Sequence, residues 1–482
     1  MSIGSCAGPP GFLASTGMWL NRILVITAVT LAVPAAPASA VPDLDTGAVE
    51  RLVTGFAARS GYPGVAVAIT KGDRVLHTAG YGDVTDRTLM PIASLSKSFT
   101  ALAVMRLVEA GRLTLDTPIR EHLPGLPERI TVRHLLHQTS GITDRTLREK
   151  SLPQPSSPAG AAERAKAATP ASEPGSDYSY TNTNYHLLAR LVEVVTGERF
   201  GDHLTRNVFT PLDMTDTINI DQTPRDLPNQ VKTGHVYAVG VSMRAVEPTR
   251  FVGGSDGVIT TARDMGRWLA AQHGTRVLSA TGMAAMRTPS GPDHSYAMGW
   301  NTDDDGTIKH DGIWFTYTAS ALIRPSGYGV AVLGDSGFSL ATGGTPALAR
   351  DLARLLEGGD PGTPAPTRLI TDLVLLALTT GTVLLGIRRL RGAATWPDRR
   401  LPLLRLVPRA LPVALFVSLP YILGAGVGGG RDITFLQVVY VVPMLVLWSA
   451  AAAGMNAATI VARGAAVFRR RRVARAEENV KA

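Results

Sequence analysis

Apolar and polar positions alternate differently in two parts of the chain. Between residues 44 and 356, short apolar runs separated by turn residues are typical of strands, and longer periodic segments are typical of helices. From residue 369 onward, three long runs carry almost no charge, at 369–387, 410–428 and 433–462. The pattern predicts a globular domain followed by a strongly apolar helical region.

Strand patterns lie at both ends of the globular part. Residues 64–69, a Lys-Gly-Asp turn and residues 74–77 predict one β-hairpin. Residues 319–323, a Pro-Ser-Gly turn and residues 329–333 predict another. Strands at both ends with helices between them predict an α+β domain with one antiparallel sheet covered by helices.

The segment between the hairpins reads mostly as helix. Gly111 and Gly197 close two of the helical patterns, as glycine commonly does at a helix end. Residues 150–176 are rich in Ala, Pro and Ser and predict a long surface loop with one short helix. The predicted helices are 98–109, 185–196 and 261–271.

The three apolar runs are long enough to cross a bilayer, which needs about 20 helical residues. The only charge within them is Asp372. We therefore expect a Gly/Pro linker at 359–367, three transmembrane helices within 368–465 and a basic tail at 466–482. The alternative is a set of buried core helices in a soluble domain.

The N-terminus has the pattern of an export signal. A short segment ending at Arg22 precedes an apolar stretch at 23–33, and Ala38 and Ala40 form a small-x-small cleavage pattern. We expect a signal peptide over residues 1–40, with translation starting at Met1 or Met18 and an uncleaved anchor as the alternative. No Arg-Arg pair is present, which favours the Sec route. The single cysteine, Cys6, would leave with the signal, which excludes disulfides and thiol chemistry in the mature chain.

The net charge of +9 is not spread over the chain. From Arg388 onward, 15 basic residues stand against four acidic ones, so the rest of the chain is slightly acidic. The basic residues flank the apolar runs, which argues against nucleic-acid binding. The positive-inside rule places the 388–409 loop and the tail in the cytoplasm, and the 41–358 domain outside, in a multi-pass membrane protein.

Three short motifs could carry chemistry. Ser94 and Lys97 are three apart at the start of an apolar helix, so they share one face, and a lysine of lowered pKa can activate a hydroxyl. Tyr180 could relay a proton and Asn182 could orient Lys97 and a substrate carbonyl. His310 and Gly312 precede the last strands, where a glycine lets substrate lie close to a strand edge.

Each motif is weak when taken alone. Ser94 and Lys97 could be a helix cap and a surface lysine, and His310 a structural histidine. His134 and His137 have the spacing of a metal pair, but no third ligand is near them in the sequence, so we expect no metal site.

The order and context of the three motifs resemble the serine β-lactamase and penicillin-recognising enzyme superfamily. The branch is that of class C β-lactamase-like serine hydrolases with S-x-x-K, Y-x-N and H-x-G motifs. The resemblance covers about residues 44–356 and includes segments outside the motifs: 131–142, 174–175, 253–254 and 260–264. It implies a β-lactamase/transpeptidase-like fold, in which helices and a helical subdomain flank the antiparallel sheet.

The resemblance also implies the roles of the residues. Ser94 would form an acyl-enzyme with Lys97 and Tyr180 moving its proton, and either could be the base. Asn182, His310 and Gly312 would bind substrate. The backbone N–H groups of Ser94 and Ile313 would hold the oxyanion. No cofactor is implied.

One departure concerns the third motif. Class C β-lactamases usually have Lys-Thr-Gly there, whereas this chain has His310-Asp311-Gly312. A neutral histidine attracts a substrate carboxylate less than lysine does, and Asp311, if it faces the cleft, would repel one. We therefore expect poor activity on β-lactams and on peptides with a free C-terminal carboxylate if Asp311 faces the cleft.

Several alternatives stay open. The substrate is expected to be a D-amino-acid peptide, such as cell-wall peptide, or an ester; a true β-lactamase is the alternative. A non-catalytic wall-binding protein or sensor that keeps the fold is another, and a transporter is disfavoured because the apolar runs contain so few charged residues. The oligomeric state is not indicated.

Overall fold

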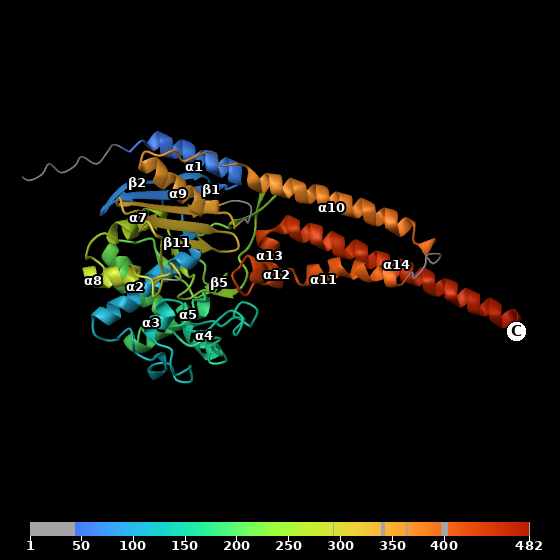
Figure 1. The fold of residues 1–482 in the computed structure, drawn as a ribbon. Coiled ribbons are helices and arrows are strands. Elements are labelled where there is room, and N and C mark those ends of the chain that lie inside the picture. Colours follow the sequence, from blue (N-terminus) through green and yellow to red (C-terminus); the bar gives the residue numbers. More distant parts are fainter. Residues whose placement is uncertain (1–43, 293, 339–342, 363–364, 397–402, 482) are drawn as a thin grey trace, which may run out of the picture. The chain divides into compact units, whose positions relative to one another are not determined.

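A computed structural model describes residues 44–481 apart from 293, 339–342, 363–364 and 397–402 (Figure 1). The export signal expected over residues 1–40 lies outside the described residues. Two regions follow one another along the chain: a mixed α/β domain up to helix α9 and a helical region from α10 onward.

A six-stranded antiparallel sheet forms the centre of the mixed domain. Its order is β10-β11-β12-β13-β1-β2, so the first and last strands of the domain are neighbours. Val65 pairs with Gly334 at one end of β1 and Lys71 pairs with Tyr328 at the other. Both predicted hairpins are confirmed. The strands are β1 (Gly64–Lys71), β2 (Arg74–Gly82), β10 (Asn301–Thr302), β11 (Ile308–Ile313), β12 (Thr318–Ile323) and β13 (Tyr328–Gly334).

The two faces of this sheet belong to two hydrophobic cores. In β1, Val65, Val67 and Ile69 pack with helices α1 (Thr46–Ser60) and α9 (Gly344–Leu356). Ala66 and Ala68 point to the other face, where helix α7 (Ala262–Ala271) lies (Figure 1). This period-two alternation is what an extended strand imposes on a sheet that is covered on both sides. The predicted α+β class is confirmed.

A helical subdomain surrounds helix α2 (Ser96–Glu109). Eleven of its 14 residues are buried, and Phe99 stacks on Trp268 with ring centroids 3.8 Å apart. The helix begins two residues before the predicted start, and Gly111, with φ +68°, follows its end. The other helices are α3 (Val132–Leu136), α4 (Pro158–Ala165), α5 (Asn182–Thr196), α6 (Phe200–Leu204) and α8 (Ala280–Arg287).

Short strands and turns connect these helices to the sheet. One small sheet joins β3 (Met90–Pro91), β9 (Val258–Thr260) and β4 (Ile218–Asn219). Two strand pairs are β5 (Gln222–Thr223) with β8 (Arg250–Phe251), and β6 (His235–Ala238) with β7 (Val241–Arg244). Short helical turns are η1 (Ala93–Leu95), η2 (Ile119–Glu121), η3 (Thr205–Phe209), η4 (Thr210–Leu212) and η6 (Leu404–Ala410).

The predicted surface loop at 150–176 contains the expected short helix, α4. The segment lies only partly at the surface, because one face of α4 packs into the core and the Lys150 side chain is only 12% exposed. Charged groups at the start of this segment therefore lie inside the domain.

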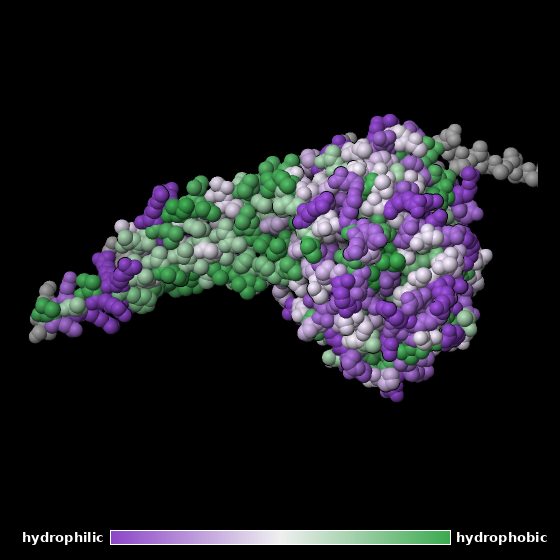
Figure 2. All heavy atoms as spheres, turned by 180° about the vertical axis from the view of Figure 1, so that it is seen from behind, coloured by the Kyte–Doolittle hydropathy of each residue, from purple (hydrophilic) through white to green (hydrophobic). Residues whose placement is uncertain are grey.

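The C-terminal region contains two helices that are long and apolar enough to cross a membrane. They are α10 (Thr367–Arg391) and α14 (Pro443–Lys481). Leu384 and Val461 are more than 60% exposed, and Figure 2 shows apolar side chains over much of this region, with hydrophilic ones toward the Arg-rich end. Such exposed apolar surface is unusual for a soluble monomer.

The second and third apolar runs differ from the expected straight spans. The second forms α11 (Leu411–Val417) and α12 (Leu419–Gly426), and its two halves are bent by 64°. The third is interrupted at Val442, between α13 (Phe435–Val441) and α14. Pro420 and Pro443 lie just beyond the two breaks, and a proline has no backbone N–H to continue the preceding helix. The second run is a third candidate span only if the bent pair counts as one.

Candidate active site

Ser94 lies in the short turn η1, directly before helix α2. Ala93, the residue before it, has a left-handed backbone with φ +48°, which costs about 1–3 kcal/mol outside glycine. The turn is held on one side by the Ile92 N–H, which donates to the Val258 carbonyl at 3.1 Å. On the other side β11 packs against it. The fold thus supports a strained backbone immediately beside the candidate nucleophile.

Lys97 is fully buried, one turn into α2 from Ser94. Its Nζ donates to Ser94 Oγ, to Asn182 Oδ1 and to the Ser255 carbonyl, each at 3.0 Å. The alternative of a surface lysine is therefore wrong. Burial lowers the pKa of Lys97 to about 8, although the nearby Asp256 carboxylate raises it. A lysine with this pKa can give up its proton near neutral pH.

Asn182 is the first residue of α5 and connects two charged groups. Its Oδ1 accepts from Lys97, and its Nδ2 donates to Asp256 Oδ2 at 3.0 Å and to Glu149 Oε1 at 3.3 Å. Thr181 caps the helix through its side chain. The predicted helix thus begins three residues early, because the polar N-terminal turn of α5 is used to hold Lys97.

Tyr180 precedes this cap and places its ring beside the lysine. Lys97 Nζ lies 4.9 Å from the ring centroid, and the hydroxyl hydrogen-bonds to the Ser94 side chain. Burial raises the pKa of Tyr180 above its ordinary value, so the side chain is a neutral phenol near pH 7. A phenol in this position is a proton donor at rest.

Asp256 is a member of the site that sequence reasoning missed. Ser94 Oγ donates to its Oδ1 at 2.7 Å, and Lys97 Nζ lies 3.5 Å from the same oxygen. Burial alone would raise the pKa of this carboxyl, but Lys97 and Arg250 outweigh it and hold the pKa well below its ordinary value. The available signal was an acid directly after Gly253-Gly254 and Ser255, in an otherwise apolar segment.

His310 projects from β11 toward the same group. Its ring centroid lies 6.3 Å from that of Tyr180, and burial, followed by the charge of Lys97, lowers its pKa to about 3. Nδ1 lies 2.8 Å from the Asp311 carbonyl, so Nδ1 carries the proton and Nε2 is an acceptor. Within the described part of the chain, this buried Nε2 has no hydrogen-bond partner.

Asp311 does not face the cleft. Successive residues of a strand point to opposite faces, and the Asp311 carboxylate accepts from Ser320 Oγ at 2.6 Å on the face away from His310. Repulsion of a substrate carboxylate by Asp311, expected if it faced the cleft, is therefore wrong. The neutral His310 still offers a substrate carboxylate no positive charge.

Gly312 allows a close approach between β11 and η1, and its expected role in admitting substrate stays a prediction. An added Cβ would lie 2.0 Å from the Ile92 carbonyl oxygen, so the glycine lets β11 approach η1. Ile313, at the end of β11, has a side chain that is 46% exposed. The close approach brings its backbone to the side of the turn that carries Ser94.

The candidate metal pair gives no sign of a ligand set. Among the described residues, no three His, Cys, Asp or Glu side chains are grouped to hold a metal ion. Burial lowers the pKa of His137 to about 4, as for a histidine buried in the core.

Comparison with known proteins agrees with this arrangement. The beta-lactamase family model matches residues 49–354. Penicillin-binding protein 4 of Amycolatopsis lactamdurans is 31% identical over 342 residues, covering 61% of this chain and 86% of that protein. Protein flp of Staphylococcus aureus (strain COL) is 28% identical over 308 residues, 56% of this chain, and the match spans only 59% of its length.

A solved structure shows the same fold. An octameric penicillin-binding protein homologue from Pyrococcus abyssi superposes with a TM-score of 0.57 at 25% identity, covering 69% of this chain and 81% of that one. The chain belongs to the beta-lactamase family of serine hydrolases, which includes penicillin-binding proteins.

Proposed function

We propose that the protein is a membrane-anchored, extracytoplasmic serine hydrolase that forms an acyl-enzyme on Ser94. The observation that carries this proposal is the buried Lys97, with Nζ 3.0 Å from Ser94 Oγ and a pKa near 8. A hydroxyl needs such a base to become a nucleophile near neutral pH. The family membership supports the same reaction type.

Of the two candidate bases, the electrostatics favour Lys97. The neutral amine accepts the Ser94 proton while Oγ bonds to the substrate carbonyl carbon. The resulting oxyanion is held by the backbone N–H groups of Ser94 and Ile313. Tyr180, a phenol at rest, protonates the leaving group and regains its proton from Lys97. Water then cleaves the ester on Ser94 and restores the enzyme.

The substrate class follows from the third motif. A neutral His310 with an acceptor Nε2 suits a donor such as an amide N–H or a hydroxyl, and gives a carboxylate no positive charge. We propose an ester or a D-amino-acid peptide without a dependence on a free carboxylate at this position. A true β-lactamase remains the second candidate, and a non-catalytic receptor the third.

The charge pattern and the exposed apolar surface of α10 and α14 support membrane anchoring. Three segments of the C-terminal region contact the hydrolase domain. Arg368 donates to the Ser60 carbonyl at 3.2 Å, Tyr440 donates to the Val246 carbonyl at 2.9 Å, and the loop before α13 carries Arg431. The positive-inside pattern supports these contacts, because it leaves the segment before the first apolar run and the loop between the second and third on the side of the domain.

Labelling by a serine-reactive fluorophosphonate tests the nucleophile. We expect Ser94→Ala to abolish labelling of the purified full-length protein. Ser98→Ala, one turn away with its hydroxyl bonded to the Leu95 carbonyl, should keep it. Undiminished labelling of Ser94→Ala would remove Ser94 as the nucleophile, and absence of labelling in the unmodified protein would favour a receptor.

A substrate panel separates the remaining candidates. p-Nitrophenyl esters and amidated D-amino-acid peptides should be cleaved faster than nitrocefin or peptides ending in free D-Ala-D-Ala. Hydrolysis of a cephalosporin with the kcat/KM of a resistance enzyme would instead establish the β-lactamase. Resistance of the protein to carbonate extraction from membranes tests the anchoring.

A further inference from the structure

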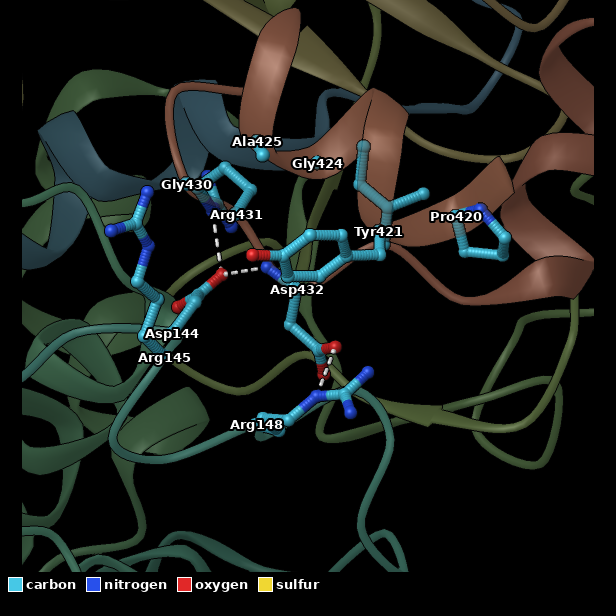
Figure 3. Close-up of a pocket in the computed structure, with 11 residues that line it drawn as sticks. Asp144, Arg145, Arg148, Pro420, Tyr421, Gly424, Ala425, Gly430, Arg431 and Asp432 are labelled. Carbon is cyan, nitrogen blue, oxygen red and sulfur yellow. Dashed lines mark hydrogen bonds and ion pairs between the residues drawn. The ribbon is translucent and has the colours of Figure 1, made fainter. Parts of the chain in front are cut away.

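The loop between α12 and α13 reaches the hydrolase domain, and Figure 3 shows Arg431 and Asp432 of this loop beside Asp144 and Arg148. Gly429 and Gly430 have φ of +61° and +88°, a backbone that glycine adopts without strain. Gly424 of α12 leaves room for the returning chain, since an added Cβ would lie 2.6 Å from the Arg431 carbonyl oxygen. These glycines turn the next residue, Arg431, toward the hydrolase domain.

Asp144 receives this loop. Its Oδ2 accepts from Arg431 Nε at 2.7 Å and from the Asp432 backbone N–H at 3.1 Å, and its side chain is 1% exposed. The Asp144 carboxylate also hydrogen-bonds to the Thr181 side chain, next to Tyr180. One buried carboxylate therefore joins the loop to the segment that carries the Tyr-x-Asn motif.

Asp432 makes a second set of contacts between the loop and the hydrolase domain. Its fully buried carboxylate accepts from the Ser151 N–H and the Ser151 Oγ, each at 2.8 Å, and from Arg148 Nε at 3.2 Å. Lys150 Nζ donates to its backbone carbonyl at 3.1 Å. An acid of each region is thus bound by the other region, which holds the loop in one position.

Arg431 faces the ring of Tyr180. The guanidinium carbon lies 4.7 Å from the ring centroid, within the range of a cation–π contact, and Lys97 Nζ lies 4.9 Å from the same centroid. Tyr180 is therefore in contact with two cations, one from α2 and one from the C-terminal loop. A cation here stabilises the deprotonated forms of both neighbours and lowers the pKa of each.

We propose that Arg431 is a positioning residue of the active site, which fixes the Tyr180 ring and supplies positive charge beside Tyr180 and Lys97. The C-terminal helical region is then part of the enzyme as well as its anchor. This inference rests on the proposed hydrolase function of Ser94.

The charges around Tyr180 and Lys97 come from several elements, and a test must separate Arg431 from the rest. The titratable and charged groups that interact with the pair are Asp144, Glu149, Tyr178, Tyr185, His186, Asp256, Tyr296, His310 and Arg431. Lys150 and Arg250 are paired with two acids of this set, Asp144 and Asp256. Removing a cation from this set should shift the pH dependence of Ser94 labelling to higher pH. Removing an anion should shift it to lower pH.

The experiment measures the rate of Ser94 labelling by a fluorophosphonate from pH 5 to pH 10 in the full-length protein in detergent. Labelling should become faster as the pH rises and Lys97 loses its proton, and we call this rising part of the curve the acid limb. For Arg431→Gln we expect the acid limb to move up by about 1 pH unit, with the same plateau at high pH. Labelling at pH 7 should therefore slow about tenfold. Arg431→Lys, which keeps the charge, should shift less. Asp256→Asn, which removes the anion that raises the pKa of Lys97, should move the limb down.

Arg51→Gln is the matched control, because Arg51 is an exposed arginine of α1, which packs on the opposite face of the sheet from α2. Its limb should coincide with that of the unmodified protein, and the thermal unfolding midpoint of each variant checks folding. An unshifted limb in folded Arg431→Gln would overturn the inference, as would a shift of the same sign in Asp256→Asn. If Arg431→Gln does not fold, Arg431→Met, which also removes the charge, is judged by the same criterion. Absence of Ser94 labelling in the unmodified protein would overturn the proposed function and this inference together.

Discussion

Lys97 is placed between two opposing influences. Burial favours its neutral amine, and the carboxylate of Asp256, 3.5 Å away, favours the ammonium. With a pKa of about 8, roughly one molecule in ten carries the neutral amine at pH 7. A Lys97 base, as proposed, would therefore work on the rising side of its pH profile under neutral conditions.

The first prediction concerns this profile. With the neutral amine of Lys97 as the proposed base, kcat/KM for an uncharged ester should fall about tenfold per pH unit below about pH 8 and level off above it. The measurement is kcat/KM for a p-nitrophenyl ester from pH 5.5 to pH 9.5, corrected for spontaneous hydrolysis. A flat profile between pH 6 and pH 8 would contradict a Lys97 base.

The second prediction concerns Asp256. Asp256→Asn removes the negative charge that raises the pKa of Lys97, so the acid limb should move to lower pH, opposite to Arg431→Gln. The variant should also lose about 3 kcal/mol of unfolding free energy, because buried Lys97 and Arg250 lose their partner. Activity profiles and denaturant unfolding measure the two effects.

Asp303→Asn is the control for this variant, since Asp303 pairs with Lys309 in a partly exposed ion pair away from Ser94. It should change neither the pH profile nor the unfolding free energy by much. Asp256→Asn with an unmoved acid limb would mean that Asp256 has only a structural role.

At the residue scale, the sequence predicts local groupings and misses distant ones. Ser94 and Lys97 are three residues apart, so helical geometry alone brings them together. Only the tertiary fold brings Asp256 and Arg431 to this pair. Asp256, for example, lies 162 residues after Ser94 in the chain. No local pattern distinguishes these two charges from solvated ones.

At the scale of elements, the contact between η1 and β11 defines the site. Gly312 lets the strand approach the turn, and the strained Ala93 is kept in place by that contact. The Ile313 N–H and the Ser94 N–H then lie on neighbouring elements, as the two donors of an oxyanion site require.

The third prediction tests that contact. Gly312→Ala places a methyl group 2.0 Å from the Ile92 carbonyl oxygen, so strand and turn must separate. We expect kcat to fall at least about 100-fold, the typical loss when one oxyanion donor is removed. Unfolding free energy should fall by about 1–3 kcal/mol from overpacking. Kinetics and thermal unfolding check both.

Gly291→Ala is the matched control, because an added Cβ there meets no atom within 4 Å. It should leave kcat unchanged. If Gly312→Ala retained full kcat, a role for this contact in placing the oxyanion donors would be untenable.

Element boundaries were harder to predict than element types. Apolar periodicity identified α5 and α2, but both begin earlier than predicted, because their first residues are polar and belong to the site. Hydropathy likewise identified the apolar runs and missed the bend between α11 and α12, which depends on where prolines remove backbone donors.

At the scale of the whole molecule, Asp432 fastens the C-terminal loop without contacting the reacting groups. Its carboxylate is fully buried and accepts from Ser151 and Arg148. Any effect of Asp432 on the chemistry must therefore pass through the position of the loop and of Arg431.

The fourth prediction follows from this separation. Asp432→Ala leaves the Ser151 N–H and its hydroxyl without their acceptor, so we expect about 1–3 kcal/mol less unfolding free energy. If the loop moves, the acid limb of Ser94 labelling should shift upward, as in Arg431→Gln. A loss of stability with an unmoved acid limb would show that the contacts of Asp432 do not affect the surroundings of Tyr180. Arg51→Gln again serves as the control.

The sequence predicted the order of the regions along the chain, but it did not predict the contacts between them. Charge counts placed the loop after α12 on the same side as the hydrolase domain, but nothing in them indicated that Arg431 would pair with Asp144. Burial of a charge is decided by the partner it meets, and that partner is 287 residues away in the chain.

The glycine-rich turn that carries Arg431 also has a consequence for biosynthesis. The chain is made from its N-terminus, so Ser94, Lys97 and Tyr180 are complete long before Arg431 is synthesised. A nascent hydrolase domain would then hold its nucleophile and base without the second cation, and would react slowly at neutral pH. Full reactivity would be reached only when the last helices are in place, so that the final step of assembly also sets the moment of activation.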